Sequence, residues 1–448
     1  MQTCHLFISH QDITITTSDG KQETTKAERY MVVYIPHVST PDEIPFYHPK
    51  VQCLAIFYTH LSNHDSSTSI IPSSGILSIH YTLFPSQPLD NRLSRTALKL
   101  AEIIHKHARG RAAGYKKRVH HDQIIGQKRF QDTYAYLKGK YAKDLIEGWV
   151  EQTPPEKHVF EDLGIAAFLI ELWVDMYGAK PDTNRDVHNT EDDEEQKKQT
   201  AQSTFPGFVD IGCGNGLLVH ILNAEGWSGW GFDARTRKSW STFPPQHTVK
   251  LEEMLLVPEI LQFASTSSTT NEESSETHST AHHNGVFPLG TFIISNHADE
   301  LTPWTPLLAF LSSSPFLAIP CCSHDFGGTR FRAPSHSKHV VPDPSTANSK
   351  KSKQPSAYAS LCSWVCHLTE STGYKVEKEH LRIPSTRNIA IVGRIKAREG
   401  EKEGGLEERL EEMRELVEKE MGGVSAGQMR DAWMKSGDGL LKPGKGGH

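Results

Sequence analysis

Three glycines and two acids in one short segment have the types and spacing of a cofactor site. The segment contains Asp210, Gly212, Gly214 and Gly216 within FVDIGCGNG, followed by Asp233 at the end of GWGFD. Glycine adopts positive φ and lets a ligand approach the main chain. An acid at the end of the second strand suits hydrogen bonds to ribose hydroxyls. Because the spacing is not the G-x-G-x-x-G of dinucleotide sites, we predict a pocket for S-adenosylmethionine (SAM); the alternative is a glycine turn without a ligand.

Polar clusters follow two later apolar runs. The first comes after TFIIS and the second after FLAI. Transfer of a methyl group to a hydroxyl requires an aligned nucleophile, exclusion of water and a base that helps to remove the proton. The candidates for the base are Asp299, Glu300, His297, His324 and Asp325. Structural alternatives are a helix cap for Asp299 and a turn residue for His324.

Some cysteine and histidine residues are also candidates for binding a metal ion. The candidates are Cys321-Cys322 and the helical group Cys362-x-x-x-Cys366-His367. Their spacing is not that of a zinc ribbon or finger, in which C-x-x-C pairs are usual. We therefore predict no metal. The seven cysteines form no regular framework, which favours reduced thiols in a cytosolic or nuclear protein.

The bulk composition narrows the class. A chain of 448 residues can bury a sizeable core, and a net charge of −6 excludes a globally basic nucleic-acid binder. No signal peptide is visible at the N-terminus. The longest apolar stretch is interrupted by Glu171 and is too short to span a bilayer. We expect a cytoplasmic protein without a membrane segment.

A local basic segment stands out against this acidic background. The segment from His105 to Lys143 contains eleven Lys or Arg residues but only two Asp residues, and aromatic residues are interleaved with them. Such a segment favours contact with RNA phosphates and stacking on unpaired bases, with a solvated helix surface as the alternative. The predicted RNA contacts in this segment are Lys116, Lys117, Arg118 and Arg129.

Apolar runs and breakers give the expected organisation. Strands are predicted at 30–35, 51–58, 76–84, 291–295, 316–319 and 389–395, and helices at 94–107, 159–177, 251–263 and 358–372. Strands that alternate with helices predict an α/β, Rossmann-like fold: a mostly parallel sheet with helices on both faces. Ligands bind at the carboxyl ends of such strands.

The expected regions have the following bounds. They are a β-rich region at 1–94, a basic helical segment at 95–177, a polar flexible insert at 178–204, the methyltransferase domain at 205–396 with polar inserts near 265–285 and 333–356, and a charged tail at 397–448. Within the tail, Leu406, Leu410, Met413 and Val417 form a narrow stripe, typical of a short packing or partner helix.

Several segments resemble the tRNA (uracil-2′-O-)-methyltransferases. They are FVDIGCGNGLLVHILNAEGWSGWGFDARTRKSW, SNHADELTPW, IPCCSHDFGG and LRIPSTRN, and the stretch KYAKDLIEGWVEQTPPEKHVFEDLGIAAFLI is also similar. The resemblance runs from about Val119 to Gly393. It implies a class I SAM-dependent enzyme that methylates the 2′-hydroxyl of uridine 44 in serine tRNA.

The resemblance also assigns residues. It places SAM on Asp210, Gly212, Gly214, Gly216 and Asp233, and we add Asn296 to the cofactor contacts. It places Asp299, Glu300, Asp325, Arg382, Ser385, Arg387 and Asn388 near the active face without naming a base. Arg235, Arg237 and Lys238 are positioned to reach tRNA phosphates. Some members carry a C-terminal CCCH-type zinc finger, and no such spacing exists here.

Two alternatives remain at this point. One is a SAM-dependent methyltransferase that acts on protein or on another RNA atom, and the basic, aromatic segment argues for RNA. The other is a non-catalytic tRNA-binding subunit with a degenerate pocket, and the intact glycines and both acids argue against it.

Overall fold

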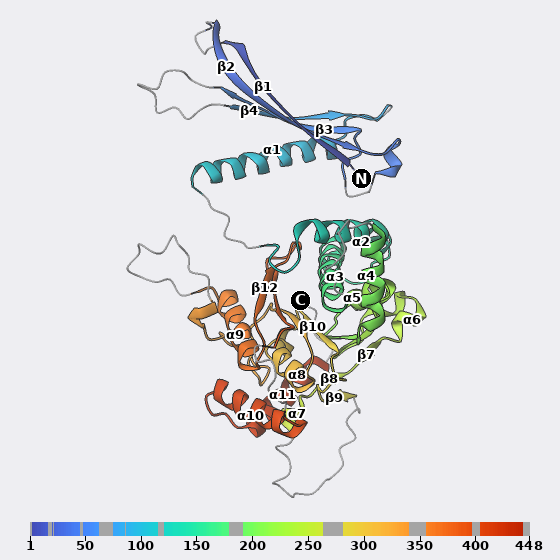
Figure 1. Cartoon of the computed structure of the whole chain (residues 1–448), viewed down its shortest axis with the longest axis vertical. Helices are drawn as coiled ribbons and strands as arrows, with labels where there is room; N and C mark the ends of the chain where they lie inside the picture. Colours follow the sequence, from blue (N-terminus) through green and yellow to red (C-terminus); the bar gives the residue numbers. More distant parts are fainter. Residues whose placement is uncertain are drawn as a thin grey trace, which may run out of the picture. The chain divides into compact units, whose positions relative to one another are not determined.

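The computed structural model divides the chain into two compact units, residues 1–118 and 119–448 (Figure 1). It describes residues 2–16, 20, 22–44, 48–61, 75–85, 87–114, 121–178, 191–262, 281–339, 355–396 and 404–441. The two units are treated separately below.

The first unit is an antiparallel sheet followed by one helix. The sheet has the order β1-β2-β3-β4 and is formed by β1 (Gln2–Thr16), β2 (Gln22–Pro36), β3 (Cys53–Leu61) and β4 (Gly75–Thr82), with a single turn, η1 (Pro41–Glu43), between β2 and β3. Helix α1 (Asn91–Ala112) begins at Asp90, whose carboxylate caps the backbone N–H of Leu93. The predicted β-rich region is confirmed, although β1 was not predicted. Because α1 contacts β4, it belongs to this unit, and the division falls after 118 instead of 94.

The second unit contains a seven-stranded sheet with the order β12-β13-β11-β10-β5-β6-β7. Its strands are β5 (Phe208–Ile211), β6 (Gly229–Asp233), β7 (Leu251–Glu253), β10 (Phe292–Asn296), β11 (Phe316–Ile319), β12 (Glu377–His380) and β13 (Ile389–Gly393). Strand β13 runs antiparallel to both of its neighbours, β11 and β12, and the other pairs in the sheet are parallel. The predicted mostly parallel α/β sheet is confirmed.

Helices cover both faces of this sheet (Figure 1). One face carries α2 (Gln127–Glu147), α3 (Pro155–Tyr177), α4 (Glu191–Thr204) and α5 (Leu217–Ala224). The other carries α7 (Glu259–Gln262), α8 (Thr305–Leu311), α9 (Ala357–Ser371), α10 (Leu406–Glu420) and α11 (Ala426–Leu441). Alternate strand residues enter the two cores: Ile294 packs into the first and Ile293 into the second.

Helix α3 is apolar on most sides because it is enclosed by other elements. It contacts α2, α4 and α5, and Trp173 near its C-terminal end is fully buried against Phe208, Trp227 and Phe292. The predicted buried helix at 159–177 is therefore confirmed. Its N-terminal half carries two adjacent acids toward the carboxyl ends of the strands.

Three sequence expectations differ from the structure. The predicted helix at 251–263 is wrong for its described residues, because the chain forms β7, the short strand β8 (Leu255–Leu256) and α7. Pro258 interrupts any continuous helix there, and β8 pairs with β9 (His282–His283) beyond a long insert.

The other two differences concern polar segments that fold. The insert at 178–204 was predicted to be flexible, yet its second half is α4, which packs against α3 through the buried Ala201. The charged tail forms α10 and α11, in which Leu410, Met413, Val417 and Trp433 are buried against the second face of the sheet. Within the tail, the stripe predicted as a packing helix is confirmed for Leu410, Met413 and Val417, whereas α11 was not predicted.

The remaining short elements are η2 (Lys238–Thr242), α6 (Pro245–Thr248), η4 (Asp299–Leu301) and η5 (Ser337–His339). Most of the predicted inserts near 265–285 and 333–356 lies outside the described residues. Among the described residues, no helix has both the length and the apolar character needed to cross a bilayer.

Candidate active site

A cavity of about 960 Å³ opens at the carboxyl ends of the central strands. It lies where β5 connects outward to β6 on one side and β10 connects to β11 on the other, which is the usual ligand site of such sheets. Its walls come from the loops after these strands, from the start of α3, from the turn before β13 and from α11.

The three glycines of the first loop all adopt positive φ, but they do different work. Their φ values are +71° for Gly212, +53° for Gly214 and +73° for Gly216. A Cβ on Gly214 would meet no atom within 4 Å, so this residue leaves the cavity open. A Cβ on Gly216 would lie 2.7 Å from the Leu251 side chain. Gly216 does not line the cavity; it permits the turn into α5 and close packing.

Asp233 joins the end of β6 to the glycine loop. Its Oδ2 accepts the backbone N–H of Gly214 at 3.0 Å. Its Oδ1 accepts the backbone N–H of Arg235 at 3.2 Å and a guanidinium N–H of Arg237 at 3.3 Å. Asp233 lines the cavity, so its carboxylate is positioned for hydroxyl donors of a ligand.

Several buried polar atoms of residues that line the cavity have no hydrogen-bond partner in the described part of the chain. Among the described residues, no hydrogen bond is made by Asp210 Oδ1, Asn296 Oδ1 or His297 Nδ1. Burial raises the pKa of the Asp210 carboxyl well above its usual range, which favours the neutral form. Buried polar groups are normally paired, and these three residues line the cavity. Their arrangement is that of a site shaped for a polar ligand.

Two acidic residues of α3 line the cavity but were not predicted from the sequence. Glu161 Oε1 lies 3.1 Å from His297 Nε2, and Asp162 Oδ1 accepts an amide N–H of Asn296 at 3.2 Å. Burial, aided by the charge of Glu161, raises the pKa of Asp162 to about 8. Burial also pushes the pKa of Glu161 upward, but the hydrogen bond and charge of His297 outweigh it and lower this pKa. Adjacent acids in an otherwise apolar helix were the available signal.

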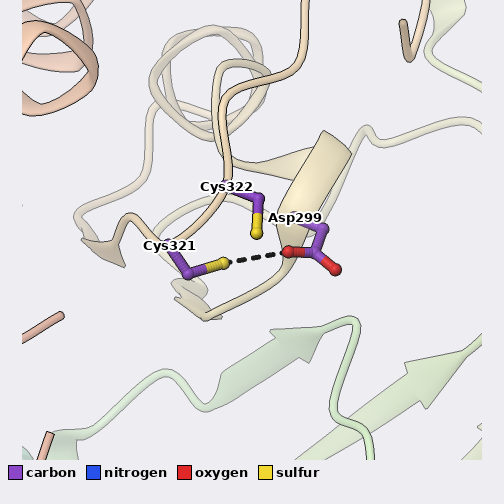
Figure 2. A group of neighbouring side chains, drawn as sticks. All are labelled: Asp299, Cys321 and Cys322. Carbon is purple, nitrogen blue, oxygen red and sulfur yellow. Dashed lines mark hydrogen bonds between the residues drawn. The ribbon is translucent and has the colours of Figure 1, made fainter. Parts of the chain in front are cut away.

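The turn after β10 carries the predicted catalytic acids. His297 and Asp299 have φ of +54° and +39°, so the backbone there is strained. The Cys321 thiol donates to Asp299 Oδ1 at 3.0 Å, and Cys322 lies beside them (Figure 2). Burial raises the pKa of Cys321, so this thiol stays protonated and acts as a donor. Burial also raises the pKa of Glu300, which lines the cavity as Asp299 does.

The structure places the other two predicted catalytic residues elsewhere. Asp325 Oδ1 accepts the backbone N–H groups of Gly327 and Thr329, both at 2.9 Å, and so stabilises a turn. His324 is buried and pairs with Arg330 in an isolated bridge. Neither lines the cavity. The chain turns away after Cys321, which is why proximity to a strand end misled the prediction.

The predicted RNA contacts fall into three groups. Arg235, Arg237 and Lys238 line the cavity. Arg129 does not, because its guanidinium pairs with Glu171 at 2.7 Å and Asp175 at 2.9 Å and ties α2 to α3. The other three, Lys116, Lys117 and Arg118, lie outside the described residues.

The turn before β13 and the C-terminal helix complete the walls. Ser385 and Arg387 line the cavity, as the resemblance implied. Arg382 instead pairs with Asp122 at 2.6 Å, and the Asn388 amide donates to the Leu381 carbonyl. Trp433 and Ser436 of α11 also contribute; no sequence pattern connected them with the site.

The strand order, the reversed β13, the positive-φ glycine loop and Asp233 together define a class I SAM-dependent methyltransferase. SAM fits the residues present: Gly214 leaves room at the loop, Asp233 offers an acceptor, and unpartnered polar atoms face the same space.

Comparisons with known proteins agree with this class. Residues 1–118 match the family described as a TRM44-like, N-terminal bet v1-like domain, and residues 124–190 and 195–258 match a predicted AdoMet-dependent methyltransferase family. The tRNA (uracil-O(2)-)-methyltransferase of Neurospora crassa is 48% identical over 86% of this chain and 68% of its own length. Proteins of the same name from Aspergillus oryzae and Saccharomyces cerevisiae are 41% and 38% identical, over 88% and 82% of this chain and 65% and 63% of their own lengths.

The chain belongs to the tRNA (uracil-O(2)-)-methyltransferase family, and SAM is its methyl donor. It spans about two thirds of the length of these relatives.

Proposed function

We propose that this protein transfers a methyl group from SAM to the 2′-hydroxyl of uridine 44 in serine tRNA. The observation that carries the proposal is one continuous cavity. Its walls include the glycine loop with Asp233, which we call the cofactor end, and the neighbouring strained turn with Asp299, which we call the acceptor end. The names of the relatives support tRNA as the substrate class. The serine tRNA and position 44 rest on the resemblance.

The cofactor end is proposed to hold SAM through three kinds of contact. The backbone around Gly212 and Gly214 borders the donor, and Asp233 accepts from its ribose hydroxyls. Asp210 and Asn296 offer polar atoms that lack protein partners. When bound, SAM supplies a methyl group that its sulfonium activates toward attack by oxygen.

The acceptor end is proposed to supply the base. Asp299 lines the cavity, and the Cys321 thiol hydrogen bond orients its carboxylate. We assign it to receive the proton of the 2′-hydroxyl; the ribose oxygen would displace sulfur from the methyl carbon, and the broken bond's electron pair would stay on sulfur as a neutral thioether. Burial raises the pKa of Glu300, which lines the same cavity, and its proposed part is to border the donor as a neutral acid.

Cationic side chains at the cavity are proposed to bind the tRNA backbone. Arg235 and Lys238 line it, and no ion pair joins either side chain to another described residue. Lys157 and Arg387 line the same cavity. Replacing Lys238 by alanine should weaken tRNA binding. The slope of the logarithm of the binding constant against the logarithm of salt concentration should fall by about one, as expected for one lost phosphate contact. Arg129→Ala should leave that salt dependence unchanged, because its charge is already paired.

The test is transfer of labelled methyl from SAM to serine tRNA that carries uridine or 2′-deoxyuridine at position 44. Loss of label in the deoxy tRNA supports the proposal. Label retained in the deoxy tRNA shows methylation of another atom, and label in protein shows a different substrate class. SAM binding without transfer to any acceptor indicates a non-catalytic tRNA-binding subunit.

A cytoplasmic location is part of the same proposal. The described cysteines are all free thiols, as expected in a reducing compartment. Fluorescence microscopy of the tagged protein checks it, and exclusive nuclear signal would contradict it.

A further inference from the structure

A group of side chains of the types that bind metal ions lies away from the cavity. It consists of His336, His367 and Glu420, whose ligand atoms all lie within 4.8 Å of one another. The three come from separate segments: His336 precedes η5, His367 is on α9 and Glu420 ends α10. None of them lines the cavity. The fold therefore brings two imidazoles and a carboxylate together at a point that the proposed reaction does not use.

The geometry of this cluster leaves one ring nitrogen without a partner. The His336 and His367 rings are stacked, with centroids 3.9 Å apart and planes 12° from parallel. His367 Nε2 lies 3.2 Å from Glu420 Oε1. His336 Nε2 is buried and makes no hydrogen bond to any described residue. A buried, unpaired ring nitrogen costs free energy, and a bound cation would offset that cost.

Surrounding groups hold these ligands in place. The Trp364 indole N–H donates to Glu420 Oε2 at 2.7 Å, which leaves Oε1 facing His367. Ser363 Oγ accepts the backbone N–H of His336 and donates to its carbonyl, both at 2.8 Å. Hydrogen bonds of this kind orient the ligands of protein metal sites.

We propose that His336, His367 and Glu420 bind one Zn²⁺ ion, with water in the fourth position. Two imidazoles and one carboxylate are a known zinc ligand set. Ligand atoms on one tetrahedral zinc lie roughly 3.3 Å apart. Binding therefore draws the three side chains together and turns the rings out of their stacked arrangement.

The expected consequence is attachment of the C-terminal helices. A shared ion joins α10 to α9 and to the segment before η5. Helix α11 follows α10 and supplies Trp433 to the cavity wall. The ion is thus a structural clamp on the segment that completes the cavity, and it takes no part in methyl transfer.

The test uses the full chain after removal of metal, titrated with Co²⁺ as a spectroscopic probe and with Zn²⁺. We expect about one Co²⁺ per chain with visible ligand-field bands, displaced by Zn²⁺. Saturating Zn²⁺ should raise the melting temperature by roughly 5 °C and slow amide hydrogen exchange in α10. The double variant His336→Ala/His367→Ala should bind Co²⁺ at least tenfold more weakly.

Two further variants keep the test decisive. Glu420→Gln retains an acceptor for Trp364 but loses the charge, so it should weaken Co²⁺ binding without lowering the melting temperature of the metal-free protein. His339→Ala is the matched control, because His339 pairs with Glu370 outside the cluster, and it should bind Co²⁺ as the wild type does.

Three outcomes would overturn the proposal. One is absence of Co²⁺ binding, and another is binding unaffected by the double variant. The third is a thiolate-to-metal charge-transfer band that disappears in Cys321→Ala/Cys322→Ala, because it would place the ion beside Asp299 (Figure 2).

Discussion

The two ends of the cavity are built in different ways. The cofactor end comes mainly from one stretch of chain, residues 208–233, through the backbone at Gly212 and Gly214 and the Asp233 carboxylate, with Asn296 added from the end of β10. The acceptor end is assembled from α3, the turn after β10, Cys321, the turn before β13 and α11. The comparison teaches that a local backbone motif can form one half of an active site, whereas the other half exists only once distant elements have packed.

The largest effect is expected at the acceptor end, from Asp299→Asn. Loss of the base should lower kcat by roughly 10²–10⁴-fold with little change in SAM affinity. Single-turnover methylation of tRNA and calorimetry with SAM measure the two quantities. The matched control is Asp325→Asn, because Asp325 stabilises a turn off the cavity and its loss should leave kcat near that of the wild type. Equal losses of kcat in both variants would contradict the assignment of Asp299 as the base.

Asp233→Asn should have the opposite signature at the cofactor end. Loss of a charged acceptor for ribose hydroxyls should weaken SAM binding by roughly 10–100-fold, while saturating SAM restores most of kcat. Glu253→Gln is a nearby control, since Glu253 bonds Thr236 and does not line the cavity. A kcat defect at saturating SAM in Asp233→Asn would show that the two ends do not act separately.

Glycine substitutions should separate space from strain within the cofactor end. Alanine at Gly214 or Gly216 must adopt positive φ, which costs about 1–2 kcal/mol. Only at Gly216 does the new Cβ also meet Leu251. We expect a larger fall in the free energy of unfolding for Gly216→Ala and a larger loss of SAM affinity for Gly214→Ala. Urea denaturation and calorimetry measure the pair, and the reverse order would contradict the assigned roles.

A further prediction concerns the pH dependence of stability. Burial raises the pKa of Asp162 from 3.8 to about 8 in the folded chain, so folding favours its neutral form. That stabilisation is complete below about pH 4 and is lost as the pH rises to about 8. Asp162→Asn cannot titrate, so its free energy of unfolding should fall less than that of the wild type between pH 5 and pH 8. Asp144→Asn, exposed on α2, should keep the wild-type fall; identical profiles for all three proteins would refute the shift.

The sequence predicts those parts of the molecule whose conformation is decided by residues close to them along the chain. The glycine loop, β11 and the buried α3 were all recognisable because spacing and apolar periodicity decide them locally. Asp233 was recognisable because it ends the next strand. The polar turn after β10 was recognisable because it follows an apolar strand, and the family resemblance agreed with it.

What could not be predicted depends on contacts between distant residues. Glu161 reaches the site only because α3 crosses the sheet and meets His297, far along the chain. Trp433 lines the cavity because α11 folds back onto the second core. His324 and Asp325 were chosen because they follow a strand end, yet the turn directs them elsewhere. Strand β8 pairs with β9, which lies about 25 residues further along the chain.

The acids gathered around the cavity have a consequence for turnover. Glu161, Asp233 and Asp299 bring negative charge to one small space, and such a space attracts a positive guest more than a neutral one of equal shape. The donor carries a formal positive charge on sulfur, and it loses that charge when the methyl group departs. We therefore expect these carboxylates to favour fresh donor over spent donor, so that loss of the methyl group weakens the hold on the by-product.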